Sequence, residues 1–127
     1  MKKNIIGLDA IKAKKLADLL NVLLANYQLF YINSRGFHWN IKVEKFFELH
    51  LKFEDLYNDL LLKIDEVAER ILTLGHTPEH SYSQYARTST IKESKKISDG
   101  LIAVEQILEG FKTTIVMQRE ILGLASD

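Results

Sequence analysis

The sequence predicts an all-α protein, a bundle of antiparallel helices, from three observations. Apolar residues recur at i, i+3, i+4 and i+7 through three long segments, which is the pattern of helices with one buried face. The alternating pattern of strands is absent, and 127 residues include only 6 glycines and 1 proline. A chain of this length with 46% hydrophobic residues suits a single domain, residues 1–127.

The first two long helices are expected to form an antiparallel hairpin. Asp9 can cap the first helix by accepting hydrogen bonds from early backbone amides. Asn40 tolerates a left-handed conformation, so the first helix is expected to stop near it, followed by a turn at residues 41–44. Gly75 and then Pro78 end the second helix.

The rest of the chain predicts one short helix and one long helix. The polar stretch after Pro78 has room for a short helix at residues 82–86. Ser98 or Asp99 is the best cap for the third long helix, which carries the last apolar stripe. The expectation is therefore three long helices and one short helix in the long crossover, packed as a bundle.

Composition excludes several classes of function. Lys and Arg number 17, as do Asp and Glu, so the formal net charge of zero argues against a polyanion-binding protein. The absence of cysteine excludes disulfides, thiolate zinc sites and thiol nucleophiles. No apolar run approaches the ~18 residues of a membrane span, and the apolar run near the N-terminus is too short for a signal peptide. A cytoplasmic protein is the expectation.

Four polar residues are candidates for a metal site. Asp65 and Glu69 lie one helical turn apart on one face of the second helix, where they are either a solvated acidic face or a chelating pair. His38 and His50, each taken alone, are more simply packed or hydrogen-bonded residues. Together, imidazoles and carboxylates without sulfur suit iron(II), manganese(II) or zinc(II). Aromatic residues nearby are most simply core: Phe37, Trp39, Phe46, Phe47 and Phe53.

Helix geometry separates these candidates into two half-sites. His50 and Asp65 are fifteen residues apart, roughly 22 Å along one helix, so they cannot share a metal within one chain. The hairpin turn brings His38 back beside His50, although one unbroken helix would hold them about 18 Å apart. A second copy related by a two-fold axis would bring the histidines of one chain to the carboxylates of the other. By contrast, His76 and His80 have no carboxylates at matching spacing and are expected at the surface.

The residues from Phe37 to Pro78 resemble the Dps family, the mini-ferritins. The family pattern is a His followed by Trp-Asn, a second His twelve residues later, an Asp fifteen further on and a Glu four beyond that. His38, His50, Asp65 and Glu69 meet every spacing, with Trp39 in place. Weaker similarity extends over most of the chain.

The resemblance implies a ferritin-like four-helix bundle that assembles from two-fold dimers into a hollow dodecamer. Inter-subunit dinuclear centres would bind iron(II), oxidise it with hydrogen peroxide or oxygen, and store ferric mineral. His38 would be the first ligand of the tighter iron, Asp65 and Glu69 of the partner chain would complete the site, and His50 would serve the second iron. Trp39 would intercept stray oxidising equivalents. Glu54 and Asp55 match positions that help nucleate mineral, although Leu51 stands where relatives often carry a further carboxylate.

The resemblance also yields one expected departure and leaves two alternatives. The chain stops where relatives continue into a fourth long helix, so a fourth helix is expected to be absent. One alternative function is DNA compaction, which zero net charge disfavours. The lysines that would bind DNA lie in a short tail and on the first helix: Lys2, Lys3, Lys12, Lys14 and Lys15. The other is a non-catalytic helical interaction module, which would make the four matching ligands a coincidence.

Overall fold

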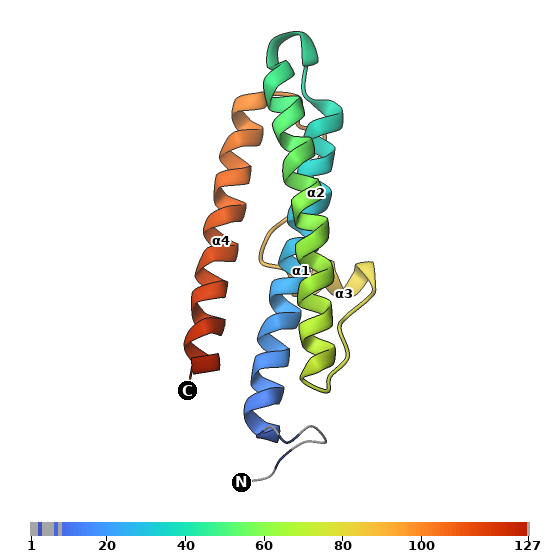
Figure 1. Ribbon diagram of the computed structural model, residues 1–127. Helices are drawn as coiled ribbons and strands as arrows, with labels where there is room; N and C mark the ends of the chain where they lie inside the picture. The colour runs from blue at the N-terminus through green and yellow to red at the C-terminus, as the bar shows by residue number, and fades with distance from the viewer. Residues whose placement is uncertain (1–2, 4–6, 8, 127) are drawn as a thin grey trace.

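The part of the chain that the structure describes forms four helices and no strand, apart from one isolated bridge between Lys3 and Asp9. The structure is a computed structural model that describes residues 3, 7 and 9–126. Three helices are long, and the short one lies in the crossover between the second and the fourth (Figure 1). Their bounds are α1 Ala10–Asn40, α2 Val43–Thr73, α3 Tyr82–Thr88 and α4 Gly100–Ser126.

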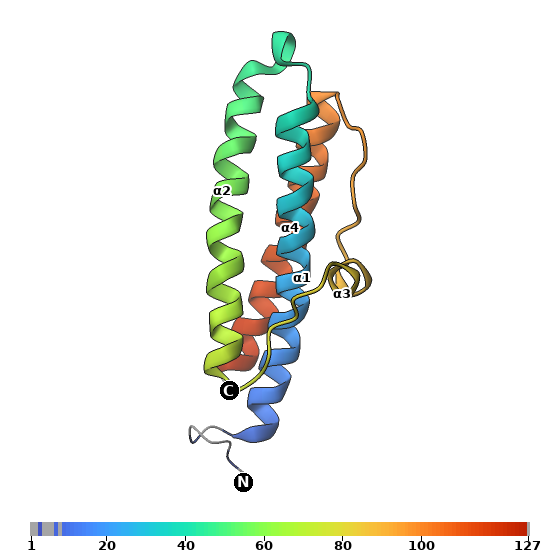
Figure 2. The same cartoon turned by 90° about the vertical axis from the view of Figure 1, so that its right-hand side faces the viewer.

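Helix α1 is the central element, because α2, α3 and α4 all pack against it. Helices α2 and α4 both run antiparallel to α1, and the crossover with α3 follows the flank of α1 back towards the α1–α2 turn (Figure 2). There the amide of Lys42 donates to the carbonyl of Ser98 just before α4 begins. The fold is therefore the all-α bundle that the sequence predicts, and His38 and His50 lie near the α1–α2 turn.

The expectation that a fourth helix is absent is wrong, because Gly100–Ser126 is the fourth helix of the described chain. This segment is the one that the apolar spacing predicts as the third long helix. It becomes fourth in order because the crossover forms α3, which continues two residues beyond the expected end at Ala86.

The helix ends confirm three of the four predicted boundary signals. Asp9 Oδ1 accepts from the amides of Ile11 and Lys12 at 3.0 and 3.3 Å, and Asp99 Oδ1 accepts from the Leu101 amide at 2.8 Å. Gly75 has φ of 84°, the left-handed end that glycine allows.

Helix α1 does end at Asn40, but not by a left-handed residue. The side-chain amide of Asn40 donates back to the Gly36 carbonyl at 2.8 Å, and the next residue, Ile41, is extended. The Asn side chain thus bonds a carbonyl of the last turn, and the chain leaves the helix through an extended residue.

The core is built mainly from α1, which buries residues on more than one face, whereas α2 and α4 each bury a single stripe. This difference follows from the central place of α1 between three neighbours. The stripe of α2 is Phe53, Leu60, Ile64, Val67 and Ile71, and that of α4 is Gly100, Ala103, Ile107, Gly110 and Thr114.

Polar side chains of α1 fasten the crossover to the bundle. Asn26 is fully buried, and its Oδ1 accepts from the Ser89 hydroxyl, the amide and hydroxyl of Thr90 and the amide of Ile91 at 2.9–3.1 Å. Asn33 binds the Lys92 carbonyl and the Ser94 amide, each at 2.9 Å. These contacts satisfy backbone groups of a segment without regular structure. Burial also raises the pKa of the Tyr85 phenol on α3, so this group remains a donor to the Glu79 carbonyl.

Gly110 permits the close approach of α4 to α1. A Cβ at this position would lie 2.8 Å from the ring of Phe30, which itself packs edge-on against Phe111 at 5.2 Å between centroids. We therefore expect Gly110→Ala to lower the free energy of unfolding by about 1–3 kcal/mol, the range of overpacking. Urea unfolding measures this change.

Gly123→Ala is the matched control for Gly110→Ala on the same helix. A Cβ at Gly123 meets nothing within 4 Å, so this variant is expected to be neutral or stabilised by about 0.5–1 kcal/mol through helix propensity. Equal stability of the two variants would show that α4 does not pack against Phe30 as described.

Candidate metal centre

Two histidines form a stacked pair: His38 near the end of α1 and His50 near the start of α2. Their ring centroids are 3.9 Å apart with an interplanar angle of 14°. His38 Nδ1 lies 2.6 Å from the carbonyl oxygen of His50, and His50 Nδ1 lies 2.7 Å from the carbonyl oxygen of His38. Each side chain is thus anchored to the backbone of the other helix, which holds both rings in one orientation.

These reciprocal hydrogen bonds determine which ring nitrogen is free to bind a metal. A carbonyl oxygen only accepts, so each Nδ1 carries the proton and donates it. In the neutral rings the lone pair therefore lies on Nε2 of both histidines. Metal-binding histidines commonly donate their other N–H to a backbone carbonyl in this way, which fixes the tautomer and the direction of the ligand atom.

Glu54 adds a carboxylate to the histidine pair. It lies one turn after His50 on α2, and its Oε2 is 3.7 Å from His38 Nε2. The side chain of His38 is 11% exposed and that of Glu54 is 47% exposed, so the three groups open to solvent on one side. Asp55, the neighbouring residue, is exposed. The structure thus separates the two positions that the sequence analysis treated together: Glu54 lies at the histidine pair and Asp55 does not contact it.

Asp65 and Glu69 lie further along α2, exposed and one turn apart. The fifteen residues from His50 to Asp65 correspond to about 22 Å of helix. Accordingly, within residues 3, 7 and 9–126 no three His, Asp or Glu side chains gather closely enough to hold a metal. One chain presents a histidine half-site with Glu54 and, separately, a pair of exposed carboxylates.

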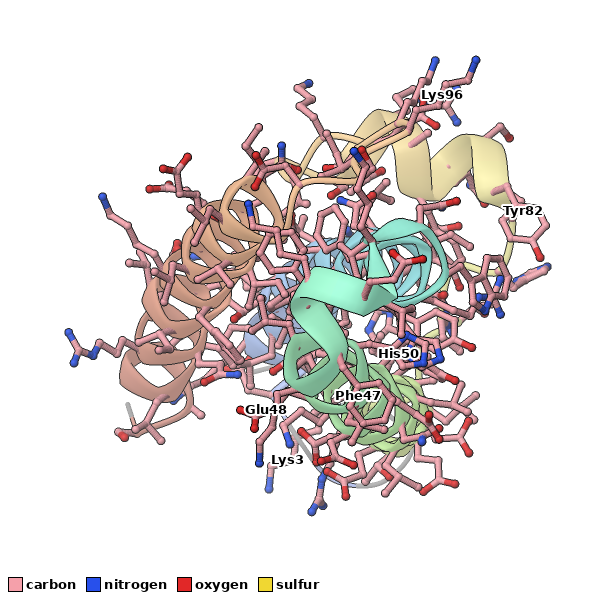
Figure 3. All side chains as sticks on the ribbon, turned by 90° about the horizontal axis from the view of Figure 1, so that it is seen from above. Lys3, Phe47, Glu48, His50, Tyr82 and Lys96 are labelled. Atoms are coloured by element: carbon pink, nitrogen blue, oxygen red, sulfur yellow. The ribbon has the colours of Figure 1, made fainter. Side chains whose placement is uncertain are left out.

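Figure 3 places the histidine half-site relative to the other helices. Viewed from the turn end, His50 lies on the flank of the α1–α2 hairpin away from α4, on the same side as Tyr82 of α3. Glu48 points to the side nearer α4, and Phe47 lies between them at the turn end. The half-site therefore opens on the outside of the hairpin and not into the space between α2 and α4.

Two of the five aromatic residues expected in the core are exposed. Phe37 and Phe53 are buried and Phe46 is partly buried, but Trp39 is 64% exposed and Phe47 is 55% exposed. The reason is rotation along the helix: Phe37 and His38 face α2, and the next residue turns about 100° towards solvent. Trp39 instead packs against the guanidinium of Arg35, 4.7 Å from its ring centroid.

Sequence reasoning missed the tyrosines beside the histidines. The Tyr57 ring lies 5.5 Å from that of His38 at an angle of 65°, and 6.0 Å from that of Tyr31 at 79°. A signal was available, because Tyr57 follows His50 by seven residues, two helical turns, and so shares its face. Phe47 also faces His50, with centroids 6.2 Å apart.

The lysines of the alternative DNA-binding function do not form a free tail in the described part of the chain. Lys2 lies outside the described residues, and Lys14 on α1 pairs with Asp18 at 2.9 Å. Among the described residues, no helix combines the length and the apolar character needed to cross a membrane.

Comparisons with known proteins identify the family of this chain. The model of the ferritin-like domain family matches residues 17–127. A DNA protection during starvation protein of Porphyromonas gingivalis is 37% identical, with 98% of this chain and 80% of that protein covered. The crystal structure of the Dps protein from Vibrio cholerae O1, a member of the ferritin-like diiron-carboxylate superfamily, is 53% identical with a TM-score of 0.95, over 99% of this chain and 79% of that chain. Dps from Staphylococcus aureus is 32% identical with a TM-score of 0.83, over 89% and 76%. The chain therefore belongs to the ferritin-like proteins and, within them, to the Dps family.

Proposed function

We propose that this protein oxidises iron(II) at dinuclear sites shared between two subunits and stores the ferric product in a hollow homo-oligomer, a dodecamer of two-fold dimers. The observation that carries the proposal is the pair of reciprocal hydrogen bonds between His38 and His50. They direct two Nε2 lone pairs to one side of the hairpin, next to the Glu54 carboxylate. A carbonyl bond would also satisfy a purely structural histidine, but two free Nε2 atoms beside one carboxylate are the arrangement of metal ligands.

The donor set suits iron as the substrate. Imidazole nitrogen and carboxylate oxygen, without sulfur, are ligands for iron(II). His38 holds the tighter iron together with Asp65 and Glu69 of the partner subunit. Glu69 of the partner subunit can extend to a second iron, which His50 and Glu54 approach from the other side. The exposed position of Asp65 and Glu69 on each chain leaves these carboxylates available to a neighbour.

Two iron(II) ions in one site suit hydrogen peroxide as the oxidant. Two iron(II) ions held together supply the two electrons that cleave the O–O bond of peroxide, and protons complete two water molecules. A pair of one-electron donors thus avoids release of hydroxyl radical. The protein's part is to hold both ions at once, fix the ligand directions and leave open coordination positions for the oxidant.

Peroxide consumption tests the proposed function directly. With excess iron(II), the protein is expected to oxidise two iron(II) ions per peroxide and to suppress the hydroxyl radical that a spin trap detects in protein-free buffer. Zinc(II), which takes the same ligands but has no redox chemistry, should inhibit the reaction. His80→Ala, which removes an exposed loop histidine and no proposed ligand, should behave as the wild type. Undiminished hydroxyl radical in the presence of the protein would exclude a coupled two-iron site.

A further inference from the structure

The start of α4 packs against the first turns of α2, the part of the chain that leads into His50. The amide of Lys42, the N-cap of α2, donates to the Ser98 carbonyl at 3.3 Å, and the α1–α2 turn lies beside the start of α4 (Figure 2). Gly100, the first residue of α4, is buried in this contact. His50 itself lies on the flank away from α4 (Figure 3), so any influence of α4 on it passes through α2.

Gly100 leaves room for the ring of Phe46. A Cβ at Gly100 would lie 2.6 Å from Phe46 Cδ1, 2.7 Å from Phe46 Cγ and 3.0 Å from Leu49 Cδ1. Real Cβ atoms essentially never come closer than 3.0 Å to such neighbours, so α2 would have to shift to accept one. Phe46 and Leu49 are four residues and one residue before His50. Gly100 therefore contacts the turn of α2 that ends at the metal ligand.

Phe46 is also the point at which α2 bends. Its φ of −125° and ψ of 36° are not helical, although the residues on both sides belong to α2. The Phe46 amide donates to the Lys42 carbonyl at 2.9 Å and closes the first turn of the helix. The direction and rotation of the long part of α2 relative to this turn depend on the backbone of Phe46, and the contact of its ring with Gly100 holds that residue in place.

The histidine pair depends on how α2 is rotated. His50 Nδ1 lies 2.7 Å from the His38 carbonyl oxygen and His38 Nδ1 lies 2.6 Å from the His50 carbonyl oxygen, one turn after Phe46. A displacement of roughly 1 Å would take either bond beyond the ordinary range of hydrogen bonds. These bonds keep the lone pairs on the two Nε2 atoms and fix their direction, so they require an exact placement of α2 against α1.

We propose that Gly100 is a positioning residue of the iron site. By admitting the ring of Phe46, it sets the rotation of α2 that holds His38 and His50 in their reciprocal hydrogen bonds. The inference rests on the proposed function for the iron, whereas the positioning itself belongs to the metal-free protein. It explains why glycine, a poor helix former, begins α4. Helix α4, which supplies no proposed ligand, thus determines where the ligand atoms of the hairpin point.

Gly100→Ala tests this role in the assembled protein. Solid-state nitrogen-15 magnetic resonance of the metal-free protein, labelled at histidine, reports which ring nitrogen is protonated, and a His76→Ala/His80→Ala background leaves only the pair. We expect protonated Nδ1 on both rings with Gly100 present and a mixture of tautomers in Gly100→Ala. Calorimetric titration with zinc(II), which has no redox chemistry, should show an affinity weakened about tenfold or more.

Gly110→Ala is the matched control. It also forces a Cβ into a ring on the same helix, that of Phe30 at 2.8 Å, but ten residues further along α4. It should lower the stability of the bundle and leave the histidine tautomers and the zinc(II) affinity unchanged. A loss of affinity in Gly110→Ala equal to that in Gly100→Ala would show general loosening of the bundle and overturn the inference.

Phe46→Leu tests the same contact from the other side. The shorter side chain leaves a gap over Gly100, so this variant should also release the tautomers and weaken zinc(II) binding. In the double variant Gly100→Ala/Phe46→Leu the new Cβ occupies that gap, and most of the affinity should return. General destabilisation would instead accumulate in the double variant, and far-ultraviolet circular dichroism confirms that each protein keeps its helices.

The outcomes separate this inference from the proposed function. Unchanged tautomers and zinc(II) affinity in Gly100→Ala and Phe46→Leu would overturn the role of Gly100, and a wild type that oxidises iron(II) would leave the ferroxidase intact. A wild type that binds neither zinc(II) nor iron(II) would remove the proposed function. The tautomers of the metal-free variants would then still decide whether Gly100 positions the histidine pair.

Discussion

A mixed dimer of His38→Ala and Asp65→Ala chains is expected to oxidise iron(II), although neither variant does so alone. Each homodimer lacks a ligand at both of its sites. In the mixed dimer, the intact His38 of one chain meets the intact Asp65 of the other, and one complete site forms. The second site of the same dimer loses both ligands. Complementation is expected because His38 stacks on His50, which lies about 22 Å along α2 from Asp65, so that in the proposed site the two ligands come from different chains.

The size of the recovered activity can be calculated. Random reassembly of equal amounts of the two variants makes half of the dimers mixed, each with one intact site of two, so about a quarter of the wild-type activity should return. The measurement is iron(II) oxidation by peroxide after the variants are unfolded together and refolded. Variants refolded separately and then mixed are the control. Recovery in neither sample would contradict a site shared between chains, and a highly active Asp65→Ala homodimer would show that this carboxylate is not a ligand.

The convergence of His38 and His50 could be predicted from the sequence, because it depends only on helix periodicity and on a turn between them. The position of Glu54 could not be predicted in the same way. Its distance from His38 depends on how α2 rotates about its axis after the turn, and the backbone of Phe46 departs from helical geometry at this point, with φ of −125°. A local kink of this kind has no signal in the apolar pattern. The exposure of Trp39 was missed for a related reason, since helix ends leave aromatic residues on faces that no neighbour covers.

The attachment of the crossover was also beyond sequence reasoning. Asparagine is a poor helix former, so Asn21, Asn26 and Asn33 within a strongly helical segment were a signal that something other than propensity selects them. Their partners, however, lie 56–65 residues away in a stretch without regular structure. Which backbone groups come within reach depends on the path of that stretch over α1, which local patterns do not encode.

Asn26→Ala is therefore expected to cause a large loss of stability, about 2–4 kcal/mol in the free energy of unfolding. The side chain is fully buried, and its removal leaves the Thr90 amide without its acceptor. The Ser89 hydroxyl and the Ile91 amide each lose one of two acceptors, and they keep only their bonds to the Ile91 carbonyl and to Ser89 Oγ. Each buried donor left unpaired costs about 1–3 kcal/mol. Urea unfolding measures the total, and hydrogen exchange at the two amides shows whether the crossover has detached.

Asn21→Ala is the control that separates the effect of burial from the effect of the hydrogen bonds. Asn21 makes the same kind of contact, accepting from the Glu79 amide at 2.8 Å and donating to the Thr77 carbonyl at 3.2 Å, but it is only partly buried. Water can replace its bonds, so we expect a loss of about 1 kcal/mol. If both variants lost the same small amount, burial of Asn26 would not be what holds the crossover. A large loss confined to Asn26 would show that one amide oxygen anchors the chain segment between the hairpin and α4, and that the bundle depends on it.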